Sequence, residues 1–152
     1  MAEHPTAAWI REVYAAFFAG DLKTTGESFA DDIVVHVAGR NPLSGSYKGK
    51  DQVFAMVAAE SELVSDLAVE IHDVLASDGH AVVLRTDSLS RNGRAWTGPV
   101  VDVMHVEDGK VAEYWNIALD QYGYDEVLNS WTQQTAASLN LPHLPNGAAV
   151  TA

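Results

Sequence analysis

Three charged residues lie within otherwise apolar, strand-like sequence in the second half of the chain. Arg85 and Asp87 are two residues apart, and Asp102 has valine or methionine for two residues on either side. Because side chains alternate across a strand, Arg85 and Asp87 share a face and would form an ion pair that fixes both side chains. A carboxyl group held in this way could act as a general acid, since burial raises its pKa and neighbouring charges adjust it.

Each of these three residues also has a structural interpretation. The Arg85–Asp87 pair is equally typical of a salt bridge that only stabilises a sheet. Asp102, if it faces inward, would be kept neutral by burial and could donate a hydrogen bond to a ligand oxygen. If Asp102 faces outward, a cross-strand partner or a dimer contact would satisfy it. The sequence leaves both interpretations open.

His36 interrupts the apolar run from Ile33 to Val37 and could exchange protons near neutral pH. It is therefore a candidate reserve base, although a core histidine bonded to a backbone carbonyl has the same signature. Strand alternation decides between the two, because His36 points away from a pocket that Val35 and Val37 face.

Further candidates for contact with a substrate come from a predicted N-terminal helix and from the two strands that follow Arg85 and Asp87. The helical candidates could equally pack in the core. The candidate contact residues are Trp9, Tyr14, Met104, Tyr114 and Asn116.

The elements that must position these residues are three consecutive strands, predicted at His80–Ser90, Arg94–Val106 and Lys110–Ile117. Asn92-Gly93 and Asp108-Gly109 lie between them, and such dipeptides adopt the positive φ angles of tight hairpins. On one face of each strand, one or two polar residues stand among apolar ones. This mixture predicts the wall of an apolar pocket with a few polar groups.

The rest of the chain is mainly helical at its start, which together with the strands predicts an α+β fold. We expect a single domain over residues 1–132 and a mobile tail over residues 133–152. The other predicted elements are helices at Ala7–Ala19 with Thr6 as N-cap, Leu22–Phe29, Lys50–Glu62 and Gln121–Thr132, strands at Ile33–Val37 and Leu67–Leu75, and a loop at Gly39–Gly49.

The opposite faces of the three strands are also apolar, and the predicted helices can cover only one side of a sheet. We therefore expect a homodimer in which the second copy covers the other side. The residues predicted on this face are Val82, Leu84, Val101, Val103, Val111, Trp115 and Ile117.

Composition narrows the class of partner and cofactor. The chain has 152 residues and a net charge of −12, which disfavours nucleic acid and anionic lipid and favours a small apolar molecule. It has no cysteine, and its six histidines are not at metal-ligand spacing, so we expect neither a metal nor another cofactor. No segment is long and apolar enough to span a membrane, and a secretory signal is absent, so we expect a cytoplasmic protein.

Several phrases resemble a known family: AGDL at residues 19–22, FADDIVVHVAG at 29–39, PLSGSYKGKDQV at 42–53 and EDGKVAEYW at 107–115. They are similar to the SnoaL-like and ketosteroid isomerase-like branch of the nuclear transport factor two-like superfamily. The resemblance implies a cone-shaped α+β barrel, with a curved antiparallel sheet wrapped around N-terminal helices. It does not imply one activity, since the fold carries many.

Residue by residue, the resemblance implies only parts of the known sites. Arg85-Thr86-Asp87 matches the Arg-x-Asp of limonene epoxide hydrolases, but their second Asp falls at Asn116, and their water-positioning Tyr and Asn fall at Val35 and Val37. Asp102 matches the protonated Asp of ketosteroid isomerases. The general base of those isomerases falls at Val37, and their helical Tyr falls at Val13.

We therefore expect a cofactor-independent enzyme that uses acid/base chemistry on a small, apolar, oxygenated molecule such as a polyketide, terpenoid or steroid-like compound. The reaction would be isomerisation, cyclisation or epoxide opening. Asp87 or Asp102 would be the acid, Arg85 would orient Asp87, Asn116 would hold substrate or water, and His36 would be the reserve base. The alternative is a non-catalytic protein of the same fold that binds a small molecule.

Overall fold

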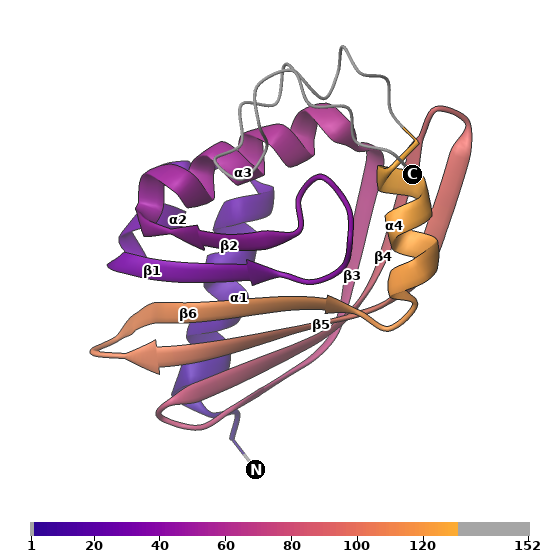
Figure 1. Cartoon of the computed structure of the whole chain (residues 1–152). Coiled ribbons are helices and arrows are strands. Elements are labelled where there is room, and N and C mark those ends of the chain that lie inside the picture. Colours follow the sequence, from indigo (N-terminus) through magenta and orange to yellow (C-terminus); the bar gives the residue numbers. More distant parts are fainter. Residues whose placement is uncertain (1, 131–152) are drawn as a thin grey trace.

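The computed structural model describes residues 2–130, which form a curved six-stranded sheet with helices packed against its concave face (Figure 1). The predicted α+β class is confirmed. The helices are α1 (Pro5–Phe18), α2 (Leu22–Glu27), α3 (Gly49–Leu63) and α4 (Gln121–Leu128), and the strands are β1 (Phe29–Val37), β2 (Gly45–Lys48), β3 (Ser65–Ala76), β4 (His80–Arg91), β5 (Arg94–Glu107) and β6 (Lys110–Ala118).

Strands β3 to β6 form an antiparallel meander, as the turn dipeptides predict. Asn92 and Gly93 have φ angles of 49° and 76°, and Asp108 and Gly109 have φ angles of 50° and 69°. These left-handed values are typical of type I′ hairpins. The sheet order is β2-β1-β6-β5-β4-β3, and β1 pairs with β6 in parallel. The sheet is therefore mixed, and not wholly antiparallel as we expected.

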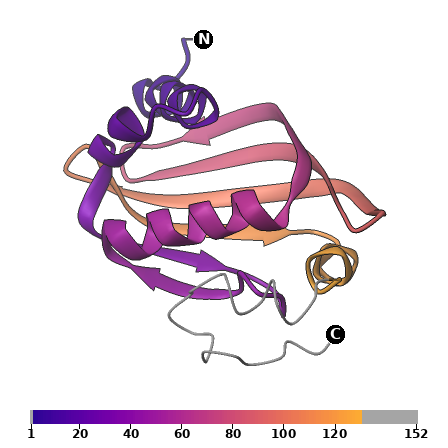
Figure 2. The same ribbon diagram turned by 90° about the horizontal axis from the view of Figure 1, so that it is seen from above.

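The helices cover the sheet at different places. Seen from above, α3 runs across the concave face, while α1 and α4 lie towards opposite ends (Figure 2). Helix α1 packs on β3 and β4, α3 packs on β1 and β2, and α4 packs mainly on β5. The fully buried side chains of Ile10, Ile33 and Leu63 join the helices and the sheet in one apolar core. The space left between α1, α3 and the sheet is where the candidate site lies.

The N-terminal elements differ from prediction at their ends. Helix α1 begins at Pro5, one of the residues best suited to a first helical turn, and His4 caps it by accepting the Thr6 amide at 3.2 Å. Thr6 is therefore not the N-cap. Helix α2 ends at Glu27, since Phe29 already belongs to β1 and pairs with β6.

Two other regions also differ from prediction. The expected loop at residues 39–49 contains β2, which the sequence hides because only pairing with β1 makes so short a segment a strand. Helix α4 ends at Leu128, with Asn129 as its C-cap, earlier than the predicted end at Thr132.

The predicted outward position of Val111 is wrong, because β6 contains a β-bulge. The register between β5 and β6 shifts at His105 and Val106, so an extra residue is inserted in β6 near its start. Such a bulge reverses the side-chain parity on its far side. Val111 is consequently 1% exposed and faces the interior, whereas Trp115 and Ile117 keep the predicted outer position.

Two expectations concern the ends of the chain and the membrane. The expected mobile tail, residues 133–152, lies outside the described residues. Among residues 2–130, no helix combines the length and the hydropathy that crossing a membrane requires.

Candidate functional site

A cavity of about 130 Å³ lies between the concave face of the sheet and helices α1 and α3. Most of its wall is apolar, including Val35, Val37 and Met104, and polar side chains reach it at a few points. This is the usual composition of a small-molecule site. The polar lining residues are Tyr14, Thr25, Glu60, Arg85, Asp87, Tyr114, Asn116 and Tyr124.

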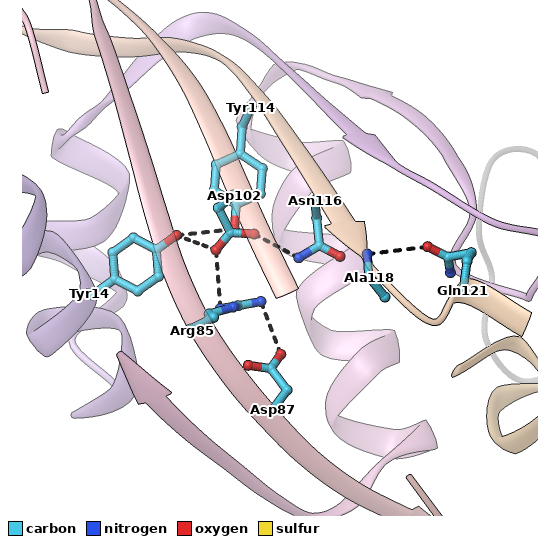
Figure 3. Close-up of polar contacts among 8 residues, drawn as sticks. All are labelled: Tyr14, Arg85, Asp87, Asp102, Tyr114, Asn116, Ala118 and Gln121. Atoms are coloured by element: carbon cyan, nitrogen blue, oxygen red, sulfur yellow. Dashed lines mark hydrogen bonds and ion pairs between the residues drawn. The ribbon is translucent and has the colours of Figure 1, made fainter. Parts of the chain in front are cut away.

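Asp102 lies behind the cavity wall and is the centre of a buried hydrogen-bond network (Figure 3). Its Oδ2 accepts from the Tyr14 hydroxyl at 2.5 Å and lies 3.3 Å from Arg85 Nη1, while its Oδ1 accepts from Asn116 Nδ2 at 2.8 Å. All of these contacts come from donors on α1, β4 and β6. Asp102 accepts in each of these contacts and is not among the residues that line the cavity; its expected role as a proton donor remains a prediction.

Arg85 connects Asp102 to Asp87. Its Nη2 lies 3.2 Å from Asp87 Oδ2, so the guanidinium is held between two carboxylates. Burial alone would lower the pKa of Arg85, but the adjacent Asp102 and the other acidic groups raise it above its ordinary value. Arg85 thus carries a fixed positive charge, and its buried Nε has no hydrogen-bond partner within the described part of the chain.

Asp87 has the environment of a proton-transfer group. It is 5% exposed, and burial raises its pKa to about 6, although Arg85 opposes the rise and Asp102 adds to it. Its Oδ1 is buried and has no hydrogen-bond partner among residues 2–130. A carboxyl group with a pKa near neutrality and a free oxygen can both accept and return a proton.

The two tyrosines of the network remain protonated. Burial and the nearby charge of Asp102 raise the pKa of both Tyr14 and Tyr114 well above the ordinary value. Their hydroxyls lie 3.3 Å apart. Tyr14 gives its proton to Asp102, and the Tyr114 hydroxyl lies against the Tyr14 oxygen, so the three groups form one hydrogen-bonded cluster.

Glu60 is a cavity residue that the sequence analysis missed. It lies near the end of α3, is half-buried, and has a pKa raised by burial, with Arg85 opposing and Asp87 and Asp102 adding to the rise. The signal was present in the spacing: Glu60 follows Met56 by four residues and Val53 by seven, and both are buried. An acidic residue on the apolar stripe of a helix predicts contact with a cavity or a partner.

The structure brings most of the predicted site residues together. Arg85 and Asp87 line the cavity from β4, Met104 lines it from β5, and Tyr14 lines it from α1. Tyr114 and Asn116 line it from β6, and Asp102 lies directly behind them. Their roles in catalysis or binding remain predictions. Trp9 is not part of the wall, since it packs half-buried against the core.

His36 does not lie at the cavity and cannot be its reserve base. Val35 and Val37 face the cavity, so the alternation of β1 sends His36 to the outer face of the sheet. There its Nε2 lies 2.6 Å from Glu113, its Nδ1 lies 2.7 Å from Ser46 Oγ, and its ring stacks on Trp115.

The helical tyrosine that the family resemblance seemed to lack is present one position later. Val13 occupies the expected position, but Tyr14 is the residue whose hydroxyl reaches Asp102. The helix turns by about 100° per residue, so a shift of one position changes which side chain meets the sheet. Pairing sequences by motif alone does not resolve a shift of this size.

Residues 2–130 contain no group of three or more acidic or histidine side chains arranged to hold a metal ion. What the cavity offers chemically is two carboxyl groups, a fixed guanidinium, three tyrosine side chains, an amide and a threonine hydroxyl in apolar surroundings.

The sequence matches a known family over most of its length. Residues 10–114 match the model of the SnoaL-like domain. An uncharacterised protein of Mycobacterium tuberculosis strain H37Rv is 28% identical over 104 residues, which are 67% of this chain and 79% of that protein.

Solved structures share the fold. Bal32a, from a soil-derived mobile gene cassette, superposes with a TM-score of 0.73 at 26% identity, over 78% of this chain and 92% of Bal32a. An NTF2-like protein of unknown function from Burkholderia pseudomallei K96243 gives 0.72 at 24% identity, over 78% and 93% of the two chains. A protein of Jannaschia sp. CCS1, provisionally assigned as a SnoaL-like polyketide cyclase, gives 0.70 at 16% identity, over 87% and 99%.

Proposed function

The chain belongs to the SnoaL-like domain family, and from this premise and the geometry of the cavity we propose that it is an enzyme. It would catalyse proton transfer within a small, apolar, oxygenated molecule without a cofactor. Some structural neighbours are provisionally assigned as polyketide cyclases, which supports this reaction class for the fold. The residues of this cavity must carry the rest of the proposal.

The proposal rests mainly on a buried hydrogen-bond acceptor that lies next to a buried hydrogen-bond donor. Asp87 Oδ1 and Arg85 Nε belong to two paired residues of the cavity wall, and neither atom has a partner within residues 2–130. In a proton transfer from carbon, Asp87 accepts the proton and the guanidinium stabilises the charge that develops on the substrate oxygen. Asp87 then returns the proton to another carbon or to the oxygen, so the step needs no other reactant.

The apolar wall favours some reactions of this class over others. In limonene epoxide hydrolases, which the sequence resembles in part, a Tyr and an Asn position the attacking water, and Val35 and Val37 occupy those positions here. Valine can neither orient nor deprotonate water. We therefore favour isomerisation or cyclisation over the opening of an epoxide by water.

Solvent isotope exchange tests this proposal before the natural substrate is known. The protein is incubated in heavy water with a panel of cyclic ketones and enones, and deuterium entering beside the carbonyl is followed by NMR. We expect exchange that Asp87→Asn reduces by 100-fold or more, the scale of one general acid or base. Asp32→Asn, which removes the same charge from an exposed site, is the matched control and should have no effect.

Binding without reaction is the second candidate function. It is favoured by the way Asp102 is satisfied from within the chain and by Val37, which stands where ketosteroid isomerases have their general base. A panel member that raises the melting temperature but exchanges no deuterium would support the binder. Exchange that persists in Asp87→Asn would remove Asp87 from the mechanism.

We also propose that the protein is a homodimer joined through the outer face of the sheet. Leu84 and Ile117 are 38% and 45% exposed on this face, next to half-buried Val101, Val103 and Trp115. A second copy would bury these apolar side chains symmetrically. The helices and the cavity lie on the other face, so such a dimer leaves the site accessible.

A further inference from the structure

An apolar groove lies on the surface beside the cavity, with a volume of about 730 Å³. Three of the large hydrophobic side chains that line it are strongly exposed: Phe18 at 46%, Leu22 at 50% and Leu67 at 42%. The other apolar side chains of its wall are those of Phe17, Phe54, Val57, Ala58 and Val64. Such a cluster of exposed apolar groups is typical of a surface that binds something.

The groove and the cavity adjoin each other. Five residues line both of them: Phe17, Phe18, Val57, Glu60 and Leu67. They come from the end of α1, from α3 and from the start of β3, and we call this side of the cavity its entrance, since a ligand that occupies both parts would pass here towards Arg85 and Asp87.

The sizes of the two parts limit what can bind. A dry cavity of about 150 Å³ in another protein holds benzene, so the 130 Å³ cavity here has room for about one ring. Any larger ligand must extend through the entrance. The groove provides room and apolar contact for that extension.

Glu60 determines the charge that the ligand can carry at the entrance. It lines both parts and lies near Asp87 and Asp102, whose negative charges act on it together with the positive charge of Arg85. A carboxylate on the ligand at this point would meet a second acidic group. A neutral or hydrogen-bond-donating group would be accepted.

We propose that the groove is a second subsite, which holds the apolar extension of a ligand whose oxygenated ring occupies the cavity. The ligand is then elongated, with a ring of about benzene size at one end, an uncharged junction and an apolar chain or second ring beyond it. The placement of the oxygenated ring rests on the proposed function, whereas the subsite for the extension does not.

The affinities of 4-alkylphenols test this proposal. Phenol, 4-ethylphenol, 4-butylphenol and 4-hexylphenol are titrated into the protein by calorimetry. Transfer of each methylene from water into an apolar site strengthens binding about fourfold. The hexyl compound has four more methylenes than the ethyl compound, so we expect the dissociation constant to fall roughly 250-fold between them.

Two substitutions in the groove and one control outside it test whether the gain in affinity along the series comes from the groove. Leu67→Ser and Phe18→Ser should each reduce the gain along the series at least tenfold. The gain is the ratio of the dissociation constants of the ethyl and hexyl compounds, so a change in the affinity for the ring itself, which these residues also contact, cancels. Leu75→Ser replaces a leucine on the same strand, 50% exposed and outside the groove, and should leave the whole series unchanged. The second groove variant, on α1, guards against misfolding of the first.

The outcomes separate this inference from the proposed function. If phenol binds but longer chains bind no more tightly, the groove is not a subsite, and the proposed function stands. If the gain persists in both groove variants, the extension lies elsewhere and the inference is wrong. If none of the four compounds binds, both are wrong. If Leu67→Ser leaves the series intact but converts a dimer to a monomer in sedimentation, the groove is a contact between copies, and the inference is again wrong.

Discussion

Asp87→Asn should stabilise the protein at neutral and alkaline pH. The amide has the shape of the neutral carboxyl group but cannot be charged. Arg85 keeps its other partner, Asp102, at 3.3 Å, so the substitution does not leave the guanidinium unpaired. A gain in stability from removing one member of a buried ion pair is unusual and therefore diagnostic.

The expected gain in stability follows from the pKa of Asp87. This pKa rises from 3.8 to about 6 on folding, chiefly because of burial. The folded state therefore holds the proton more tightly than the unfolded state does. This contributes fully to the stability of the fold below pH 3.8, and the contribution is lost as the pH rises through 6. At pH 8 the ionised Asp87 costs about 3 kcal/mol relative to a neutral group. We expect Asp87→Asn to raise the free energy of unfolding by about 2 to 3 kcal/mol, or the melting temperature by roughly 5 to 10 °C.

Urea denaturation between pH 4 and pH 8.5, followed by circular dichroism, measures this difference directly. The variant should be more stable at pH 8. The difference should shrink towards pH 4 and vanish only below about pH 3, where wild-type Asp87 is protonated in both states. Asp21→Asn is a control of opposite sign. Hydrogen bonds from Thr24 lower the pKa of the exposed Asp21. The ionised Asp21 therefore stabilises the fold above pH 3.8, and this stabilisation is lost in acid.

The reasoning is refuted if Asp87→Asn is less stable than the wild type at pH 8. The attraction of Arg85 for the carboxylate would then exceed the cost of burial, and the pKa of Asp87 would lie below 3.8. Carboxyl NMR of Asp87 would confirm that reversal, and the carboxylate would then be too weak a base for the proposed transfer of a proton from carbon.

Three further substitutions test the site and the dimer. Tyr14→Phe removes a buried hydrogen bond to Asp102 and should cost about 1 to 3 kcal/mol in urea denaturation; an unchanged midpoint would mean that water replaces the hydroxyl. Arg85→Met leaves two buried acidic groups without their cation and should lower the free energy of unfolding by about 3 to 5 kcal/mol at pH 8. Adding Asp87→Asn to the same chain should restore part of this stability. If the second substitution restores none of it, the stability was lost through packing and not through charge. Ile117→Lys places a charge in the proposed dimer face and should yield monomers in analytical ultracentrifugation with the cavity intact, whereas a persistent dimer would place the contact elsewhere.

The sequence predicted the three-strand meander because its local signals are strong. The turn dipeptides need positive φ angles, and a period of two places Arg85 and Asp87 on one face of their strand. For Asp102 the sequence left the inward and outward orientations open, and the structure shows that it is buried. The same rule predicted that His36 points away from any pocket that Val35 and Val37 face. In the structure Val35 lines the cavity, so His36 lies on the outer face of the sheet. Where the signal is a local backbone preference, prediction and structure agree.

The partners of Asp102 and the entrance of the cavity could not be predicted in this way. Tyr14 reaches Asp102 from a helix, and strand alternation does not say which helical residue meets which strand. Glu60 follows the apolar stripe of α3, but an acidic residue near a helix end is usually solvated. The inward position of Val111 depends on a bulge, which is a property of the pairing of two strands and not of either strand alone.

The parallel pairing of β1 with β6 has a consequence for the folding pathway. It joins segments near the two ends of the described chain, such as Val35 with Tyr114, and contacts so distant in sequence form late because closing a long loop is costly. Asp102 receives donors from α1 and β6 in addition to Arg85 on the neighbouring strand β4, so all its donors are in place only when both α1 and β6 have docked. We expect a φ-value near zero for Tyr14→Phe in folding kinetics, and a value near one would show that α1 docks early. A partly closed sheet would leave the side chain of Asp102 with Arg85 as its one partner in the network, so the buried network also makes folding of the domain cooperative.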